Sequence, residues 1–170
     1  DLTYTPGGNF HGADSFTFTV NDGELDSAAA TVSITVTAVN DAPTADAQSV
    51  STDEDTPAAI TLTGSDADGD TLTYAVAADP ANGTLSGTAP NLTYTPNENF
   101  NGSDSFTFTV SDGGATSAPA AVSITVNAVN DPPVADDQAV STDEDTPLAV
   151  TLTASDVDGD PLTYSFTQPA

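Results

Sequence analysis

Carboxylates dominate the chemistry that this sequence could perform. The 170 residues include 26 Asp and Glu, a single His, and no Lys, Arg or Cys, which gives a formal net charge of −26 at pH 7. The acids cluster in short segments such as Asp53-Glu54-Asp55 and Asp66-Ala67-Asp68-Gly69-Asp70. Like charges within one loop repel each other, and a hard divalent cation removes this repulsion by binding about six to eight oxygen ligands. The clusters therefore predict calcium sites. A solvated acidic surface of the salt-adapted kind is the alternative, and the two can coexist.

The segment 66–70 alternates acidic with small residues. In a tight turn this spacing presents the carboxylates to one side, and Gly69 eases the bend. An EF-hand loop is a poor match, because its sixth and twelfth positions would be Thr71 and Ala77 instead of Gly and Glu. The same pattern recurs later in the chain, at Asp156, Asp158 and Asp160. The last acid of each segment, Asp70 or Asp160, either binds metal or shapes the turn.

The chain lacks residue types and segments that several classes of function require. Without Lys or Arg it has no basic patch for nucleic acid or for an anionic membrane surface. No stretch approaches the roughly 20 apolar residues of a membrane span, so we expect no membrane insertion. His11 is the only histidine, and its loop position favours a solvated side chain over a catalyst. The paired acids lack the aromatic cleft with which a glycosidase holds a sugar. We therefore expect no enzymatic activity.

An internal repeat organises the acidic clusters. Three motifs occur twice: LTYTP at 2–6 and 92–96, DSFTFTV at 14–20 and 104–110, and STDEDTP at 51–57 and 141–147. The offset is 90 residues each time, and about two-thirds of the 80 overlapping positions are identical. Proline in the first linker (39–43) and in the second linker (129–133) stops strand pairing. These linkers divide the chain into the second half of one domain (1–41), a complete domain (42–130) and the first half of a third (131–170).

Alternation of apolar and polar residues with a period of two dominates the whole sequence, and no segment has a helical stripe. Turn residues separate seven predicted strands in the complete domain, at 46–51, 58–64, 71–77, 84–87, 91–95, 104–111 and 119–128. Seven short strands in a repeat of about 90 residues predict an all-β fold of immunoglobulin-like sandwiches.

Motifs along the whole chain resemble the cadherin repeat. They stand in the order Glu54-Asp55-Thr56-Pro57, Asp66-Ala67-Asp68, Leu72-Thr73-Tyr74, Asp112-Gly113 and the second linker, VNDPP. The segment 95–113 is similar, more specifically, to the core of the bacterial cadherin-like repeat of very long secreted adhesins. The resemblance implies tandem immunoglobulin/cadherin-like sandwiches, Ca²⁺ between successive domains, and an extracellular location at the cell surface.

Transferred by position, the resemblance implies one calcium-binding junction at each linker. The first junction would use Asn40, Asp41, Asp66, Asp68 and Asp112. The second would use Glu54, Asn130, Asp131, Asp156 and Asp158. The LDRE segment of cadherins is absent, and Asp104 or Glu98 is the candidate replacement. Ala38 and Ala128 stand where the linker of the family has its first acid, so we expect fewer ions per junction than in vertebrate cadherins.

The function that this resemblance implies is mechanical. We expect a calcium-rigidified stalk or fibre segment of a large extracellular bacterial adhesin or surface filament, whose partners are neighbouring repeats of the same protein. The alternative is that the repeats themselves bind a partner by homophilic or lectin-like contact, although no exposed aromatic cluster stands out in the sequence. A fibre assembled from many chains is a third possibility.

The two end segments are complementary parts of one repeat. Residues 1–41 supply the later strands and residues 131–170 the earlier ones, and only the stretch matching Ala81 to Pro90 is missing from both. We expect the tail of one unit and the head of the next to form one sandwich. They would be joined covalently through about ten further residues, or would combine by strand complementation between chains. Strands that rise roughly 3.3 Å per residue give an expected axial repeat of about 80–95 Å.

Overall fold

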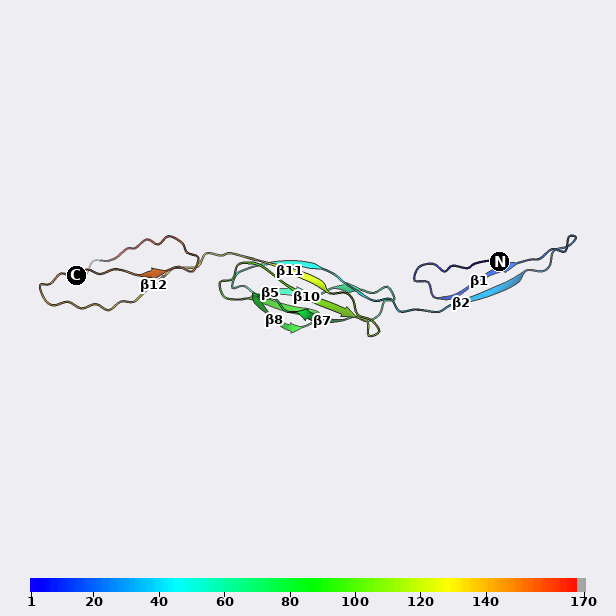
Figure 1. Cartoon of the computed structure of the whole chain (residues 1–170), viewed down its shortest axis with the longest axis horizontal. Coiled ribbons are helices and arrows are strands. Elements are labelled where there is room, and N and C mark those ends of the chain that lie inside the picture. Colours follow the sequence, from blue (N-terminus) through cyan, green and yellow to red (C-terminus); the bar gives the residue numbers. More distant parts are fainter. Residues whose placement is uncertain (168–170) are drawn as a thin grey trace.

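Three successive parts make up the molecule. The computed structural model describes residues 1–167, and in that part of the chain every regular element is a β-strand, which confirms the all-β prediction. Figure 1 shows the parts in a row. We name them the head segment (1–41), the central domain (42–130) and the tail segment (131–170), of which residues 168–170 lie outside the described part.

Two sheets form the central domain. The four-stranded sheet has the order β4-β11-β10-β7, with bounds Gln48–Asp53, Ala120–Asn127, Gly102–Ser111 and Thr73–Ala78. The three-stranded sheet has the order β5-β9-β8, with bounds Ala58–Thr61, Asn91–Pro96 and Gly83–Thr88. Strand β4 runs parallel to β11, and the other pairs within these two sheets are antiparallel.

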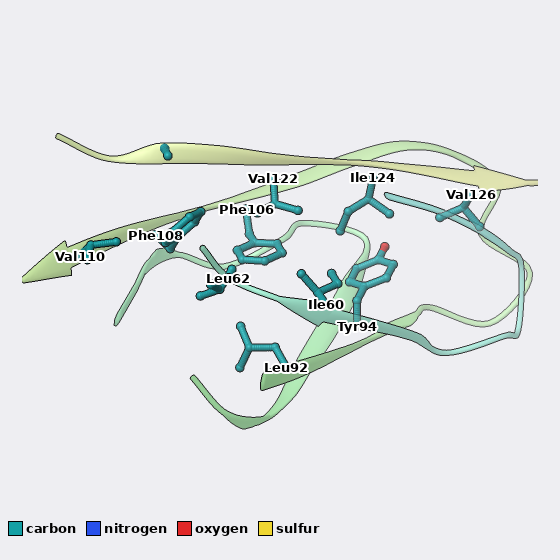
Figure 2. Packing of buried hydrophobic residues seen from close by; sticks show 11 residues of the cluster. Ile60, Leu62, Leu92, Tyr94, Phe106, Phe108, Val110, Val122, Ile124 and Val126 are labelled. Carbon is teal, nitrogen blue, oxygen red and sulfur yellow. The ribbon is translucent and has the colours of Figure 1, made fainter. Parts of the chain in front are cut away.

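The alternating sequence pattern determines which side chains enter the core. On β11, Val122, Ile124 and Val126 are at most 3% exposed, whereas Ser123 and Thr125 between them face solvent. Figure 2 shows how the buried side chains of the two sheets meet, namely Ile60, Leu62, Leu92 and Tyr94 on one side and Phe106, Phe108, Val110, Val122, Ile124 and Val126 on the other. Burial of each large apolar side chain contributes roughly 1.5–3 kcal/mol, so this layer holds the two sheets together.

The seven predicted strands are all present, with one difference in their extent. The strand predicted at 58–64 divides into β5 and the two-residue β6 (Gly64–Ser65), which pairs with β3 (Thr44–Ala45) instead of with β9. A Cβ atom on Gly64 would lie 2.7 Å from the carbonyl oxygen of Thr44. Glycine at this position therefore avoids a close contact with Thr44, although the tail makes the equivalent strand pair with Ala154.

The head and tail segments repeat parts of the central domain, but neither segment encloses an apolar core as that domain does. Strands β1 (Gly12–Phe18) and β2 (Ala30–Val36) form an antiparallel hairpin whose register matches that of β10 and β11. The tail contains the short pair β12 (Val134–Ala135) and β13 (Ala154–Ser155), which matches β3 and β6. Large apolar side chains of both segments remain exposed.

Candidate metal centres at the two linkers

The turn after β6 brings three carboxylates together. One ligand atom from each of Asp66, Asp68 and Asp70 lies within 4.8 Å of the others. The turn is held by Asp66 Oδ1, which accepts hydrogen bonds from the backbone N–H groups of Asp68 (2.9 Å) and Asp70 (3.2 Å). The other oxygen, Oδ2 of Asp66, is buried and accepts no hydrogen bond. A buried carboxylate oxygen without a donor is costly unless a cation neutralises it.

The first linker lies against this turn. Asp41 donates its backbone N–H to Asp68 Oδ2 at 2.7 Å, and Asn40 Nδ2 donates to Asp112 Oδ2 at 2.9 Å. The N–H of Ala115 and the amide of Asn40 lower the pKa of the Asp112 carboxyl, so this group is ionised at neutral pH. The five residues predicted for the first junction are therefore connected through the linker and the two loops next to it.

The second linker repeats this geometry. Asp131 donates its backbone N–H to Asp158 Oδ2 at 2.7 Å, as Asp41 does to Asp68. Asp156 Oδ1 accepts the N–H of Asp160 at 3.1 Å, as Asp66 Oδ1 accepts that of Asp70. Asn130 Nδ2 donates to the carbonyl oxygen of its neighbour Asp131 at 3.1 Å, and Asn40 makes the equivalent bond at the first linker.

Glu54 fixes the second linker from the side of the central domain. Its side chain is only 4% exposed, and its Oε1 accepts the backbone N–H of Val129 at 2.5 Å. Its Oε2 accepts a longer bond of 3.4 Å from Asn101 Nδ2, and its own N–H donates to the carbonyl oxygen of Asn127. Because the chain contains no Lys or Arg, no side-chain ammonium or guanidinium group can balance this buried charge.

Asp131 lies in the negative field of four other acids at the second linker. Burial raises the pKa of its carboxyl group, and the charges of Asp158, Asp55, Glu54 and Asp156 raise it further. Its Oδ2 atom is buried and accepts no hydrogen bond, like Oδ2 of Asp66 at the first linker. Carboxylates from the central domain, the linker and the tail segment thus converge on one point.

The two linkers contact different neighbouring elements. At the first linker the structure joins the linker residues to the downstream turn and to Asp112. At the second it joins the linker residues to the downstream turn and to the upstream Glu54. Two contributors were missing from the predicted set: Asp55, whose charge acts on Asp131, and Asn101, which donates to Glu54. Their loops meet only in the folded domain.

Asp104 differs from the other predicted ligands, because its carboxylate is used inside the central domain. Its two oxygens accept the N–H groups of Ala81 (3.0 Å), Asn82 (2.9 Å) and Ser105 (2.8 Å) and the hydroxyl of Tyr94 (2.9 Å). Burial alone would raise the pKa of Asp104, but these four donors outweigh it, and the pKa lies below its ordinary value. We therefore assign Asp104 to the support of the loop before β8 and leave it out of the junction sets.

The donor groups at both linkers fit a hard cation. They offer carboxylate and amide oxygens, and the sequence contains no cysteine that could supply a thiolate. Oxygen donors in flexible, carboxylate-rich loops are the ligands that Ca²⁺ prefers. A cation bound at these linkers would neutralise the buried oxygens of Asp66 and Asp131, which accept no hydrogen bond.

Solved structures with similar chains include cadherin domains and modules of carbohydrate-active enzymes. Human mucin-like protocadherin EC1-2 is 20% identical with a TM-score of 0.49, over 76% of this chain and 74% of that one. The protocadherin GammaB4 extracellular domain is 20% identical with a TM-score of 0.44, over 84% of this chain and 29% of that one. The endo-fucoidan hydrolase MfFcnA4 from glycoside hydrolase family 107 is 30% identical with a TM-score of 0.44, over 73% of this chain. The match spans only 20% of the enzyme's length.

Sequence comparison identifies the family. No curated protein sequence matches the chain. None of the described segments forms a helix with the length and apolar character needed to cross a membrane. The model of the bacterial Ig domain matches residues 1–35, 40–125 and 130–170, which is almost the entire sequence. The chain therefore belongs to the family of bacterial Ig domains.

Proposed function

We propose that this chain is a calcium-stabilised, non-catalytic structural repeat of an extracellular bacterial stalk or filament. The observation that carries the proposal is the convergence of carboxylates on both linkers, with buried, unpartnered oxygens on Asp66 and Asp131. A chain without Lys or Arg cannot neutralise these groups by itself. Bound calcium would supply the missing positive charge and a coordination shell shared by adjacent domains.

The chain's own residues orient the linkers for this role. Asp68 and Asp112 hold Asp41 and Asn40 on the downstream loops, and Glu54 holds Val129 at the base of the upstream domain. The first linker is thus hydrogen-bonded to the domain that follows it, and the second linker to the domain before it and to the turn after it. With the carboxylates uncompensated, mutual repulsion opposes this docking, and the junction loosens.

Calorimetry with two matched double variants tests the proposal. Asp66→Asn with Asp68→Asn removes two carboxylates of the first junction, whereas Asp46→Asn with Asp79→Asn removes two exposed acids elsewhere in the central domain. The first pair should abolish calcium uptake at one junction and leave uptake at the other unchanged. The second pair should bind calcium like the parent chain. Equal uptake by the first pair and the parent would contradict the proposed ligands.

A further inference from the structure

We propose that strand β7 of the central domain pairs with β7 of a second copy of this chain, antiparallel and across a two-fold axis. The four-stranded sheets of the two copies would then form one continuous sheet. Every strand of that sheet lies within the central domain, so the contact does not involve the open apolar faces of the head and tail segments. The pairing does not require calcium at the linkers.

Strand β7 lies at an edge of its sheet, with no partner on its outer side. In the order β4-β11-β10-β7 it pairs only with β10. Apart from this ladder, residues 73–78 make no backbone–backbone hydrogen bond within the part of the chain that the structure describes. The outer edge therefore presents free N–H and C=O groups, to which a further strand can bind.

The two sides of the central sandwich differ in charge. Strand β4 lies next to β5, so β7 and β8 form the opposite side (Figure 1). Strands β7 and β8 with their connection, residues 73–88, contain Asp79 as their only acid. Strands β4 and β5 with theirs, residues 48–61, contain Asp53, Glu54 and Asp55. Copies that each carry a net charge of −26 therefore repel each other least along the β7 side, which favours a second copy there over a cationic partner.

One register makes the sequence of β7 self-complementary. Directly opposite residues in antiparallel strands lie on the same face of the sheet, so the two-fold axis must pass between two copies of the same residue. With the axis at Ala75, Tyr74 of each copy lies opposite Val76 of the other, and the two Ala75 residues face each other. The bulge in the pairing of β7 with β10, at Ala77, lies outside these pairs.

The side chains that would meet in this register are incompletely covered in the single chain. Tyr74 and Val76 pack against the core but remain half-buried, and Ala75 is exposed. Pairs of an aromatic and a β-branched residue stabilise antiparallel strands more than Ala–Ala pairs do. One short strand buries much less than the about 1,200–2,000 Å² of a stable complex. We therefore expect a weak dimer, with a dissociation constant of about 0.1–1 mM.

Strand β8, at the neighbouring edge of the other sheet, is less suited to such pairing. Gly83 and Gly87 carry no side chain, and the φ angle of Gly87 is +98°, which lies outside the range of a regular strand. Leu85 is the one large apolar residue of β8, so two copies of this strand cannot form the two apolar cross-strand pairs that β7 offers. Leu85 therefore provides a matched control for Tyr74.

A single introduced cysteine tests the contact directly, because the sequence contains none of its own. In the proposed register the two Ala75 Cα atoms lie about 4.5–5.5 Å apart, a distance that a disulfide spans. Under mild oxidation at about 1 mM chain, Ala75→Cys should form a covalent dimer at least roughly tenfold faster than Ser51→Cys, an exposed position on the opposite edge strand β4. Thr73→Cys, whose partner in this register is Ala77, should cross-link more slowly than Ala75→Cys.

Sedimentation measures the same association without a cross-link. Chelator keeps the result independent of the calcium proposal, and salt of about 1 M screens the repulsion between copies. We expect the parent chain to pass from monomer to dimer between about 0.1 and 1 mM. Tyr74→Ala removes the aromatic member of both Tyr–Val pairs and should weaken association roughly tenfold. Leu85→Ala, which removes a half-buried apolar side chain from β8, should associate like the parent.

The cross-linking comparison does not depend on the folding of Tyr74→Ala, so a loss of stability in that variant leaves the proposal testable. A parent chain that is still monomeric at about 1 mM would overturn the proposal. So would an Ala75→Cys chain that cross-links no faster than Ser51→Cys or Thr73→Cys. Association that Leu85→Ala weakens as strongly as Tyr74→Ala, or that neither variant weakens, would place the contact elsewhere on the molecule and would also overturn it.

Discussion

At the scale of single residues, this chain stabilises carboxylates in two ways. Asp104 is surrounded by four hydrogen-bond donors of its own domain. Asp131 has a buried oxygen without a donor and lies among four other acids. The first arrangement is complete within the polypeptide, whereas the second leaves a buried carboxylate oxygen that a bound cation would neutralise.

Asp104→Asn tests the internal arrangement. The asparagine amide would replace one carboxylate oxygen by an N–H₂ group, which cannot accept the hydrogen bonds that the carboxylate accepts. The central domain should therefore lose about 1–3 kcal/mol of unfolding free energy. For a domain of about 90 residues this lowers the melting temperature by at least about 5 °C. Asp14→Asn is the matched control, because Asp14 is the exposed counterpart in the head segment. A central domain that melts like the parent after Asp104→Asn would show that the four hydrogen bonds contribute no stability.

The pH dependence follows from the same residue. Because the pKa of Asp104 is lower in the folded domain than its ordinary value of 3.8, its contribution is fully present above that value. The contribution is lost as the pH falls through the lower, folded pKa. In chelator, the difference in melting temperature between the parent and Asp104→Asn should be constant from pH 7 to about 5 and should shrink below about pH 4. A difference that grows on acidification would have the wrong sign.

Sequence patterns predicted most of the residues that the structure groups at the linkers, but not all of their surroundings. The acids of linkers and turns were visible because they recur with an offset of 90 residues. Asp55 and Asn101 were missed, because their roles depend on contact between loops that are far apart in the sequence. The hydrogen bonds that Asp104 accepts also depend on the fold, since three of their donors belong to residues 10 to 23 positions earlier in the sequence.

At the scale of elements, alternation with a period of two predicted the seven strands of the central domain. It could not assign strands to sheets, since the parallel pairing of β4 with β11 joins segments about 70 residues apart. Nor did it predict the division of the strand at 58–64, which arises because Gly64 and Ser65 pair with β3. Such tertiary constraints leave no periodic signal in the sequence.

Gly83→Ala tests how closely β8 approaches its paired strand β9. A Cβ atom at this position would lie 2.6 Å from the carbonyl oxygen of Thr95 and closer still to the ring of the buried Tyr94. The substitution should cost the central domain about 1–3 kcal/mol of unfolding free energy, measured by denaturant titration. Gly114→Ala is the control in the same domain, because its Cβ would meet Asn40 at an ordinary 3.5 Å. Equal stability of the two variants would contradict the close packing of β8 on β9.

At the scale of the whole molecule, the proposed function depends on how the parts are held in line. The central domain encloses its own apolar core, whereas the acids that lack partners lie at the linkers. Removal of calcium should therefore leave the central domain folded and should act on the relative orientation of the parts. Repulsion within a chain of net charge −26 then favours many orientations over one.

Small-angle X-ray scattering with and without calcium tests this account most directly. Dilute samples at about 0.15 M salt allow single molecules to be compared. We predict a larger maximum dimension and a stiffer particle with calcium than with chelator. The change should be smaller in a chain that carries Asp66→Asn and Asp68→Asn, which keeps only the second junction. The same maximum dimension with calcium and with chelator would contradict calcium-dependent rigidity.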